Sequence, residues 1–495
     1  MWLIRWCGGK ISYYLIDNIL SKTIRNNIAW SMLERFGTVG VQFLIQLILA
    51  RLLNPDDYGL CAILLVFVNI FTLLVDSGLP IALVQNKCFS QRDYSSVFYT
   101  VLGMSIVAYA IIYVSAPFCA IFFENPMITS TLRLMSISII FGSINSVQVA
   151  YIKHNMLFKT QFIANTISIT LSAVISIYMA INGLGVWAIV AQYLIGRVVV
   201  TLLLSIMLTW RPTWEFSYSR LKSLFSYGWK LMATNFLSLA VSDIYTALIG
   251  KMYTSDRLGV YDTGTKIPTT ISNSMTMSIG AVLFPLFSKH QDDKAALKYY
   301  LGRSNIITSF FVFPLMFSMA ACSDQIVMVV LTEKWTAAIP FMQIACIMHA
   351  FYPIHLNNLH VINALGRSDI GLKLEIIKKA IDMLFLVVFI SIGLEWVAIG
   401  RMLTSIISLV INLKPNAKLI NYSVSEQIKE VLPTFCISII TSLILVFIGK
   451  FLTCSNIVGL LIQMLVGLSI YTMLSYVFNR KDVRIVLSVI KGRSN

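Results

Sequence analysis

Charged side chains within long apolar stretches are the residues of this chain best placed to do chemistry. A charge at the centre of a bilayer costs about 2.5 to 3.5 kcal/mol on insertion scales, so each one suggests a cavity, an ion pair or an ion path. Asp76 and Asp243 are each the only charged residue in their apolar stretch. A carboxyl group in a medium of low dielectric constant can take up and release protons near neutral pH. Both residues are therefore candidates for ion coupling, and the sequence leaves open protons, sodium or no coupled ion.

Three arginines in apolar stretches suit a different task. Arg35, Arg197 and Arg401 have no acidic residue one helical turn away in the sequence, and arginine keeps its charge at any ordinary pH. The planar guanidinium binds phosphate through two parallel hydrogen bonds, so these residues would suit a phosphate-bearing ligand. The alternative is an ion pair between helices, with Asp76 or Asp243 as the partner.

Four further charges in the stretch 374–393 are spaced for mutual neutralisation. Glu375 and Lys379 are four residues apart, as are Lys378 and Asp382. Residues at this spacing lie on one face of a helix and can pair. This favours a structural role, although the two lysines could also extend toward the membrane surface.

The apolar stretches themselves predict an all-α integral membrane protein. Hydrophobic residues make up 57% of the chain and charged residues only 12%, against about 25% charged in a typical soluble domain. About 20 apolar residues span a bilayer, and fourteen stretches reach roughly that length. The expected spans are 28–53, 59–84, 95–118, 128–151, 161–182, 184–209, 231–250, 267–287, 305–325, 339–364, 374–393, 395–412, 431–449 and 456–477.

Lysine and arginine fall almost entirely in every second loop between these spans. If the N-terminus is cytoplasmic, the loops and tails on that side carry 26 of the 38 Lys and Arg residues, and few lie in the opposite loops. Cytoplasmic loops of membrane proteins carry an excess of these residues. We therefore expect both termini in the cytoplasm. The net charge of +16 then reflects topology and contact with anionic headgroups, not nucleic-acid binding.

Cysteine and histidine usage gives no sign of a metal or a cofactor. The eight cysteines are scattered, and no two have the spacing of a metal or redox pair. His349, His355 and His360 do not fall on one face of a helix, so we expect neither a metal site nor a cofactor. Residues 1–27 lack a clean apolar core and a cleavage site, which favours an interfacial helix over a signal peptide.

An internal repeat indicates two lobes. The segment ARLLNPDDYG (50–59) resembles GKMYTSDRLG (250–259), and GLGVWAI (183–189) resembles GLEWVAI (393–399). Six spans therefore repeat in the same direction, and such parallel repeats place a binding site between lobes. The expected parts are a cytoplasmic tail or interfacial helix (1–27), an N-lobe (28–209), a cytoplasmic linker (210–230), a C-lobe (231–412), two further helices (431–477) and a cytoplasmic tail (478–495).

Segments in a characteristic order carry a resemblance to a known family. They are ARLLNPDDYG, VDSGLPIALVQ, GVWAIVAQ, WRPTWEFS with FSYGWKLM, GKMYTSDRLGVYDTGTKIP, VLFPLFSKHQDD and LTEKWTAAIPFMQI. From about residue 22 to 420 the chain resembles the Wzx-type polysaccharide exporters of the multidrug/oligosaccharidyl-lipid/polysaccharide (MOP) flippase superfamily, most closely the colanic-acid exporter branch.

The resemblance implies a bacterial inner-membrane flippase of two six-helix lobes with two extra helices. It would move polyprenyl-diphosphate-linked repeat units of O-antigen, capsule or exopolysaccharide from the cytoplasmic to the periplasmic leaflet by alternating access. Family members are thought to bind the diphosphate or acidic sugars with cationic residues in a lumen. Here these residues would be Arg35, Arg197, Lys266 and Arg401. The expected partners are the lipid-linked oligosaccharide and the bilayer, with a polysaccharide polymerase and chain-length proteins nearby, and the protein would be a monomer.

A sugar head cannot cross hydrocarbon unaided, because its hydroxyl groups would lose their water without replacement. Polar side chains within the spans could line a passage for it, or could hydrogen-bond neighbouring helices instead. These residues are Gln42, Gln46, Asn69, Asn145, Gln148, Asn165, Asn235, Tyr245, Asn273, Asn357 and Asn358.

Other function classes fit the sequence less well. Asp56 and Asp57 resemble the acidic pair of a membrane glycosyltransferase, but the chain has no large loop to hold an acceptor, and the same objection applies to a polymerase. We therefore predict no catalytic residue. Two closer alternatives are a drug exporter of the same superfamily and a flippase for the peptidoglycan precursor lipid II. A drug exporter would concentrate acidic residues in its lumen, whereas this chain has at least as many intramembrane arginines without an acidic residue one helical turn away as it has isolated acidic residues.

Overall fold

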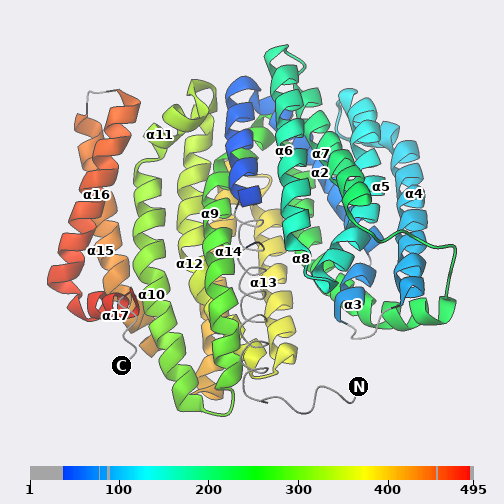
Figure 1. Cartoon of the computed structure of the whole chain (residues 1–495). Helices are drawn as coiled ribbons and strands as arrows, with labels where there is room; N and C mark the ends of the chain where they lie inside the picture. The colour runs from blue at the N-terminus through cyan, green and yellow to red at the C-terminus, as the bar shows by residue number, and fades with distance from the viewer. Residues whose placement is uncertain (1–29, 31–36, 77, 86–89, 453–454, 491–495) are drawn as a thin grey trace, which may run out of the picture. The chain divides into compact units, whose positions relative to one another are not determined.

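The computed structural model describes residues 30, 37–76, 78–85, 90–452 and 455–490 (Figure 1). These residues form helices joined by short turns and include no β-strand, which confirms the prediction of an all-α protein. The chain divides into two compact units, Met1–Lys251 and Met252–Asn495.

More than half of the predicted spans lie wholly within a described helix. Those that begin in the first unit are Gly37–Leu52, α2 (Pro55–Asp76), α3 (Leu79–Gln85), α4 (Gln91–Phe122), α5 (Met127–His154), α6 (Phe158–Ile181), α7 (Val186–Met207) and α8 (Tyr218–Met252). Those of the second unit are α9 (Ser255–Lys289), α10 (Lys294–Ala321), α11 (Ser323–Ile326), the short helices η1 (Val327–Leu331) and η2 (Glu333–Ala338), α12 (Ile339–Ala364), α13 (Ser368–Phe389), α14 (Leu394–Leu419), α15 (Val424–Phe451), α16 (Asn456–Phe478) and α17 (Arg480–Ile490).

Within the described ranges, eleven helical segments are long and apolar enough to cross a membrane. The other three predicted spans overlap Gly37–Leu52, α8 and α13. The α13 helix carries the charged residues noted above, and these lower its mean hydropathy. The helices are thus consistent with fourteen crossings.

The predicted span 59–84 is broken into α2 and α3. Gly78 separates the two helices and has φ of 71°, a left-handed conformation that glycine adopts without steric cost. Pro80 follows in the first turn of α3, where proline is tolerated because that turn needs no backbone N–H donor. Asp76 therefore lies at the end of a helix and not within a continuous span.

The repeat seen in the sequence is also visible in the local structure. A two-residue bend precedes Pro55 at the start of α2, and the same bend precedes Ser255 at the start of α9. Likewise, α5 and α12 each end in a three-residue turn that leads into the next helix. Met156 and Gly366, at matching places in these turns, both have positive φ, of 54° and 71°. A left-handed residue just after a helix allows its last carbonyls to be satisfied.

Helix α5 is the scaffold of the first unit, because it packs against α2, α4 and α7. Its contact with α4 is made by small polar side chains: Ser143 Oγ donates to Ser105 Oγ over 3.1 Å, and both residues are buried. On α7, Thr201 Oγ1 donates to the carbonyl of Phe141 over 3.0 Å. Small and hydroxyl side chains let membrane helices approach closely.

Helix α17 is held to α15 by a buried carboxyl group. Asp482 Oδ2 accepts hydrogen bonds from Thr434 Oγ1 at 3.1 Å and Asn479 Nδ2 at 2.6 Å, and the residue is 3% exposed. Burial raises the pKa of the Asp482 carboxyl group above its ordinary value. The folded protein therefore binds this proton more tightly than the unfolded chain does.

We expect this proton to make stability depend on pH. The contribution of Asp482 is most favourable below the unfolded-state pKa of about 4 and declines as the pH rises through the higher folded-state value. Asp482→Asn, which cannot ionise, should flatten this part of the stability curve. Thermal unfolding of the detergent-solubilised protein between pH 4 and 7 measures the effect. Parallel curves for the two proteins would contradict it.

Candidate functional site

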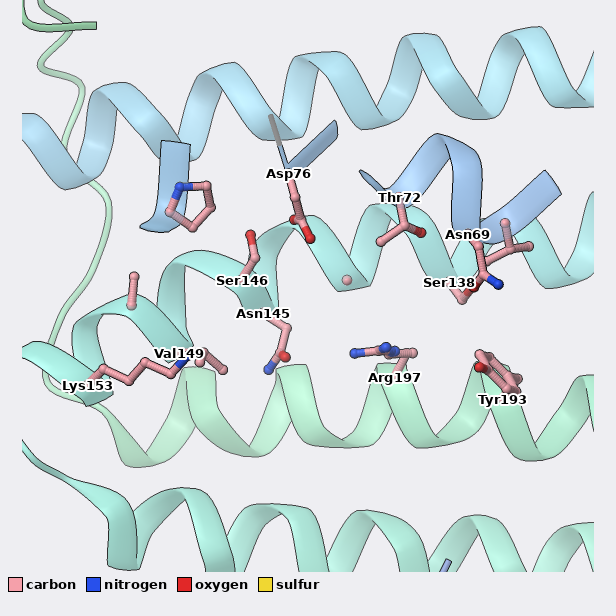
Figure 2. A pocket seen from close by; sticks show the side chains of 14 residues that line it. Asn69, Thr72, Asp76, Ser138, Asn145, Ser146, Val149, Lys153, Tyr193 and Arg197 are labelled. Carbon is pink, nitrogen blue, oxygen red and sulfur yellow. The ribbon is translucent and has the colours of Figure 1, made fainter. Parts of the chain in front are cut away.

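The first unit contains a polar cavity of about 390 Å³, walled by α2, α5 and α7 (Figure 2). Polar side chains from all three helices face it. The lining residues are Val68, Asn69, Thr72, Asp76, Pro80, Ser138, Gly142, Asn145, Ser146, Val149, Ala150, Lys153, Tyr193 and Arg197.

Helical periodicity brings these residues to the cavity. On α2, Asn69, Thr72 and Asp76 follow one another at intervals of three and four residues, and on α7 Tyr193 and Arg197 are four apart. Residues at these intervals lie on the same face of a helix. Figure 2 shows the α2 side chains pointing toward the α7 side chains across the space.

Helix α5 supplies the longest wall. Ser138, Gly142, Asn145, Val149 and Lys153 form a line along one face of this helix. Lys153 lies near the C-terminal end of α5, and Asp76 ends α2. The charged side chains of the lining are thus distributed along the helices, with Arg197 near the middle of α7 and Lys153 and Asp76 near the ends of α5 and α2.

The cavity carries two cationic side chains, Arg197 and Lys153, and one acidic side chain, Asp76. The positive charge of Arg197 acts on the Asp76 carboxyl group, which also interacts with the Ser146 hydroxyl. No carboxylate oxygen of the described residues lies within 4.0 Å of a guanidinium nitrogen of Arg197. No described group accepts a hydrogen bond from this guanidinium. The donors of Arg197 are therefore available to a ligand in the cavity.

Asn145 supplies a second unsatisfied donor. Its side chain is 8% exposed, and its Nδ2 has no hydrogen-bond partner among the described residues. A buried polar group without a partner costs about 1 to 3 kcal/mol. Figure 2 shows the amide on the cavity side of α5, close to Arg197. An oxygen-rich ligand would supply the missing acceptor.

Gly142 adds room to the cavity that it lines. A Cβ atom added to Gly142 would meet no atom within 4 Å. The missing side chain therefore leaves space for a ligand beside α5.

Asp243 interacts with a residue that lines the cavity. It is 7% exposed on α8, and its carboxyl group interacts with the side chain of Asn69, which lines the cavity. Its Oδ2 has no hydrogen-bond partner within the described part of the chain. The two predicted ion-coupling residues are thus both connected with this cavity, Asp76 directly and Asp243 through Asn69.

The other predicted binding residues lie elsewhere. Arg401 Nη1 donates to Tyr261 Oη over 3.3 Å in the second unit, where Lys266 Nζ lies 4.0 Å from Asp262 Oδ2. Neither cation lines the cavity of the first unit. Arg35 is outside the described residues. Of the three predicted cations that the structure describes, only Arg197 lines this cavity.

One ion pair on α13 has a different spacing from the two pairs predicted from the sequence. Lys378 Nζ contacts Glu375 Oε1 at 2.5 Å, so the pair is three residues apart and not four. The side chain of Lys378 is only 8% exposed. This ion pair supports the structural role that the spacing had suggested.

Sequence reasoning missed Lys153 and Tyr193. Lys153 comes just after the predicted span 128–151, so the sequence places it in a cytoplasmic loop. In the structure α5 continues to His154, and Lys153 lines the cavity. Tyr193 stands in an apolar run without any special signal. The four-residue interval from Tyr193 to Arg197 could have indicated a shared face.

The chain matches a family model described as "Polysaccharide biosynthesis protein" over residues 48–340. Among curated proteins it is 25% identical to the "Succinoglycan biosynthesis transport protein ExoT" of Rhizobium meliloti (strain 1021) over 66% of each chain. It is 22% identical to the "Teichuronic acid biosynthesis protein TuaB" of Bacillus subtilis (strain 168), over 71% of this chain and 73% of TuaB. It is 21% identical to the "Lipopolysaccharide biosynthesis protein WzxC" of Escherichia coli (strain K12), over 80% of this chain and 81% of WzxC.

Solved structures with similar folds are transporters. The inward closed conformation of the lipid II flippase MurJ aligns with a TM-score of 0.74 and 15% identity, over 92% of this chain and all of MurJ. An inward-facing multidrug resistance MATE family transporter of the MOP superfamily aligns with a TM-score of 0.59 and 14% identity, over 77% of this chain and 96% of that protein. At these identities the likeness shows the fold, and it confirms the MOP architecture predicted from the sequence.

Proposed function

Because the chain belongs to the polysaccharide biosynthesis protein family, we propose that it is a flippase for polyprenyl-diphosphate-linked oligosaccharide repeat units. It is a multi-pass membrane protein of the Wzx type and a transporter, not an enzyme. The proposed lipid carrier is a polyprenyl diphosphate. The proposed movement is from the cytoplasmic to the periplasmic leaflet of the bacterial inner membrane.

The observation that carries the proposal is the cationic cavity of the first unit. The guanidinium of Arg197 has donors available for two phosphate oxygens, and Lys153 adds a second positive charge toward the helix ends. Arginine and lysine together suit a diphosphate, since one binds it through a fork and the other as a point charge. Asn145 Nδ2 offers a further donor.

The rest of the lining suits a sugar. Asn69, Thr72, Ser138 and Tyr193 also line the cavity and can exchange hydrogen bonds with hydroxyl groups. Such contacts replace the water that a sugar loses when it leaves the aqueous phase. The cavity therefore combines an anion-binding region with a region for neutral polar groups.

The charge balance favours this substrate over a cationic drug. Two cationic side chains face a single acidic one, so a positively charged ligand would be repelled. The described cavity thus argues against the drug-exporter alternative.

Asp76 connects substrate binding with ion coupling. The diphosphate and the Asp76 carboxylate would both be attracted to Arg197, so they compete for the same positive charge. Protonation of Asp76 would remove the competitor and strengthen phosphate binding. Proton binding to Asp76 and phosphate binding to Arg197 would then be thermodynamically coupled.

Deletion of the gene in its native bacterium tests the function. The expected result is accumulation of lipid-linked repeat units in the inner leaflet and loss of the corresponding surface polysaccharide. Mass spectrometry of extracted lipids and polysaccharide staining measure both. Normal polysaccharide combined with drug hypersensitivity would contradict the proposal, as would accumulation of lipid II.

A further inference from the structure

An apolar groove of about 540 Å³ lies between α2 and α4, within the first unit. It extends along α4 from Tyr99 to Ile111, which corresponds to about 18 Å at 1.5 Å per residue. Its lining residues are Phe71, Leu74, Val75, Tyr99, Thr100, Gly103, Met104, Val107, Ala108, Ile111 and Phe216.

The groove presents almost no polar group. The hydroxyl of Thr100 donates to the carbonyl of Ser96 over 2.8 Å, so it is already satisfied within α4. Gly103 leaves the floor open, since a Cβ atom there would meet nothing within 4 Å. Met104 and Val107 are exposed along its wall. A flexible hydrocarbon chain fits this lining, and a polar group does not.

The groove and the polar cavity are on different faces of the same helix. Leu74 and Val75 of α2 line the groove, whereas Thr72 and Asp76 line the cavity. Val75 and Asp76 are adjacent, and they end α2. A molecule with an anionic head and an apolar tail could therefore place one part in each by passing around this helix end.

Helix α2 ends at this boundary. The chain turns at Gly78, which has positive φ, and Pro80 of the following short helix α3 contributes to the polar cavity. Helix α3 packs against both α4 and α5, so a ligand that occupies both sites would pass between α2 and α3.

Aromatic side chains mark one end of the groove as interfacial. Tyr99 stacks on Trp214, with ring centroids 5.6 Å apart and an angle of 18° between the planes, and Trp214 is 95% exposed. Phe216 closes the same end. Tryptophan and tyrosine concentrate where a membrane protein meets the headgroup region. From there the groove leads toward the hydrocarbon.

We propose that this groove seats the polyprenyl chain of the substrate while the diphosphate and sugars occupy the polar cavity. The assignment rests on the proposed function. It adds a defined binding site for the lipid tail on α2 and α4, so the tail is held by the protein and not left in bulk lipid. Affinity should then depend on the length of the isoprenoid chain.

Binding to the purified full chain tests the tail site. The probes are a long-chain polyprenyl diphosphate and dimethylallyl diphosphate, which shares the head group but has a single isoprene unit. Gly103→Phe should weaken binding of the long-chain probe by about tenfold, because the added ring would occupy the groove and remove packing contacts between the chain and its walls. Binding of dimethylallyl diphosphate should not change. Gly103→Leu, a smaller change, should give a smaller loss.

Ile106→Phe is the matched control. Ile106 is 51% exposed on α4 but does not line the groove, so this variant should bind both probes as the unmodified protein does. Unchanged long-chain binding in Gly103→Phe, combined with loss of both probes in Arg197→Ala, would overturn the tail site and leave the proposed function standing. Failure of the unmodified protein to bind either diphosphate would overturn both.

Crosslinking distinguishes a substrate tail from an ordinary lipid. A diazirine-bearing polyprenyl diphosphate should label the peptide that contains Met104 and Val107, and unlabelled polyprenyl diphosphate should displace it. Equal labelling by a diazirine-bearing phosphatidylethanolamine, without displacement, would assign the groove to membrane phospholipid and overturn the proposal.

Discussion

Arg197→Ala is expected to abolish most transport while leaving the protein folded. Loss of one partner of a buried charged hydrogen-bonded pair costs about 2 to 5 kcal/mol. Since each 1.4 kcal/mol is a factor of ten, substrate binding should weaken by about thirtyfold or more. No described residue accepts a hydrogen bond from the Arg197 guanidinium, so its removal breaks no hydrogen bond between the described helices. The measurement is the export of lipid-linked repeat units by the variant and by the unmodified protein, each present in equal amount in the membrane.

Two further variants separate charge from geometry at this site. Arg197→Lys keeps the charge but loses the planar fork, so it should retain partial activity. Arg133→Ala is the matched control, because Arg133 also lies in a predicted span but stacks on Tyr113 at 4.0 Å and does not line the cavity. This control should export normally. Wild-type export in Arg197→Ala would show that the cavity does not bind the anionic part of the substrate.

Gly142→Phe should block the same cavity by volume instead of charge. The added ring would extend into space where a Cβ atom meets nothing within 4 Å, so it should fill the cavity without forcing α5 from its neighbours. We expect export to fall by about tenfold or more, because the substrate would lose contact with Arg197 and Asn145. A loss of about 1.4 kcal/mol of binding free energy corresponds to a factor of ten. The initial rate of export measures the loss.

Gly142→Ala is the control for the backbone effect of the same change. Alanine inside a helix is more favourable than glycine by about 0.5 to 1 kcal/mol, so this variant should be slightly more stable and should still export. Equal export by Gly142→Phe and Gly142→Ala would mean that the substrate passes by another route.

Much of the fold could be predicted because the bilayer restricts it so strongly. Backbone polar groups in hydrocarbon must be satisfied within the segment, so long apolar stretches become helices. The predicted span 339–364 coincides with α12 for this reason. The repeat was visible because turns need particular residues, as the bends before Pro55 and Ser255 show. The break at Gly78 was the main local departure, since glycine and proline also occur within continuous membrane helices.

The site could be predicted only in part. Asp76 and Arg197 were identified because a charge in hydrocarbon is costly, and both face one cavity. Lys153 was missed because a lysine next to a span has the same appearance whether it faces a cavity or the cytoplasm. Asn145 was one of many polar residues within spans, and most of these could equally well bond a neighbouring helix.

The sequence by itself therefore determined that this protein lies in a bilayer, where its helices are, that it contains an internal repeat, and which kinds of charge it carries within the spans. Only the tertiary structure decided which charges meet. Whether two residues on different helices face each other depends on the rotation and packing of those helices, and the periodicity within each helix does not specify this. The packing of α2, α5 and α7 placed Arg197, Lys153 and Asp76 around one cavity, and it placed Arg401 and Lys266 elsewhere.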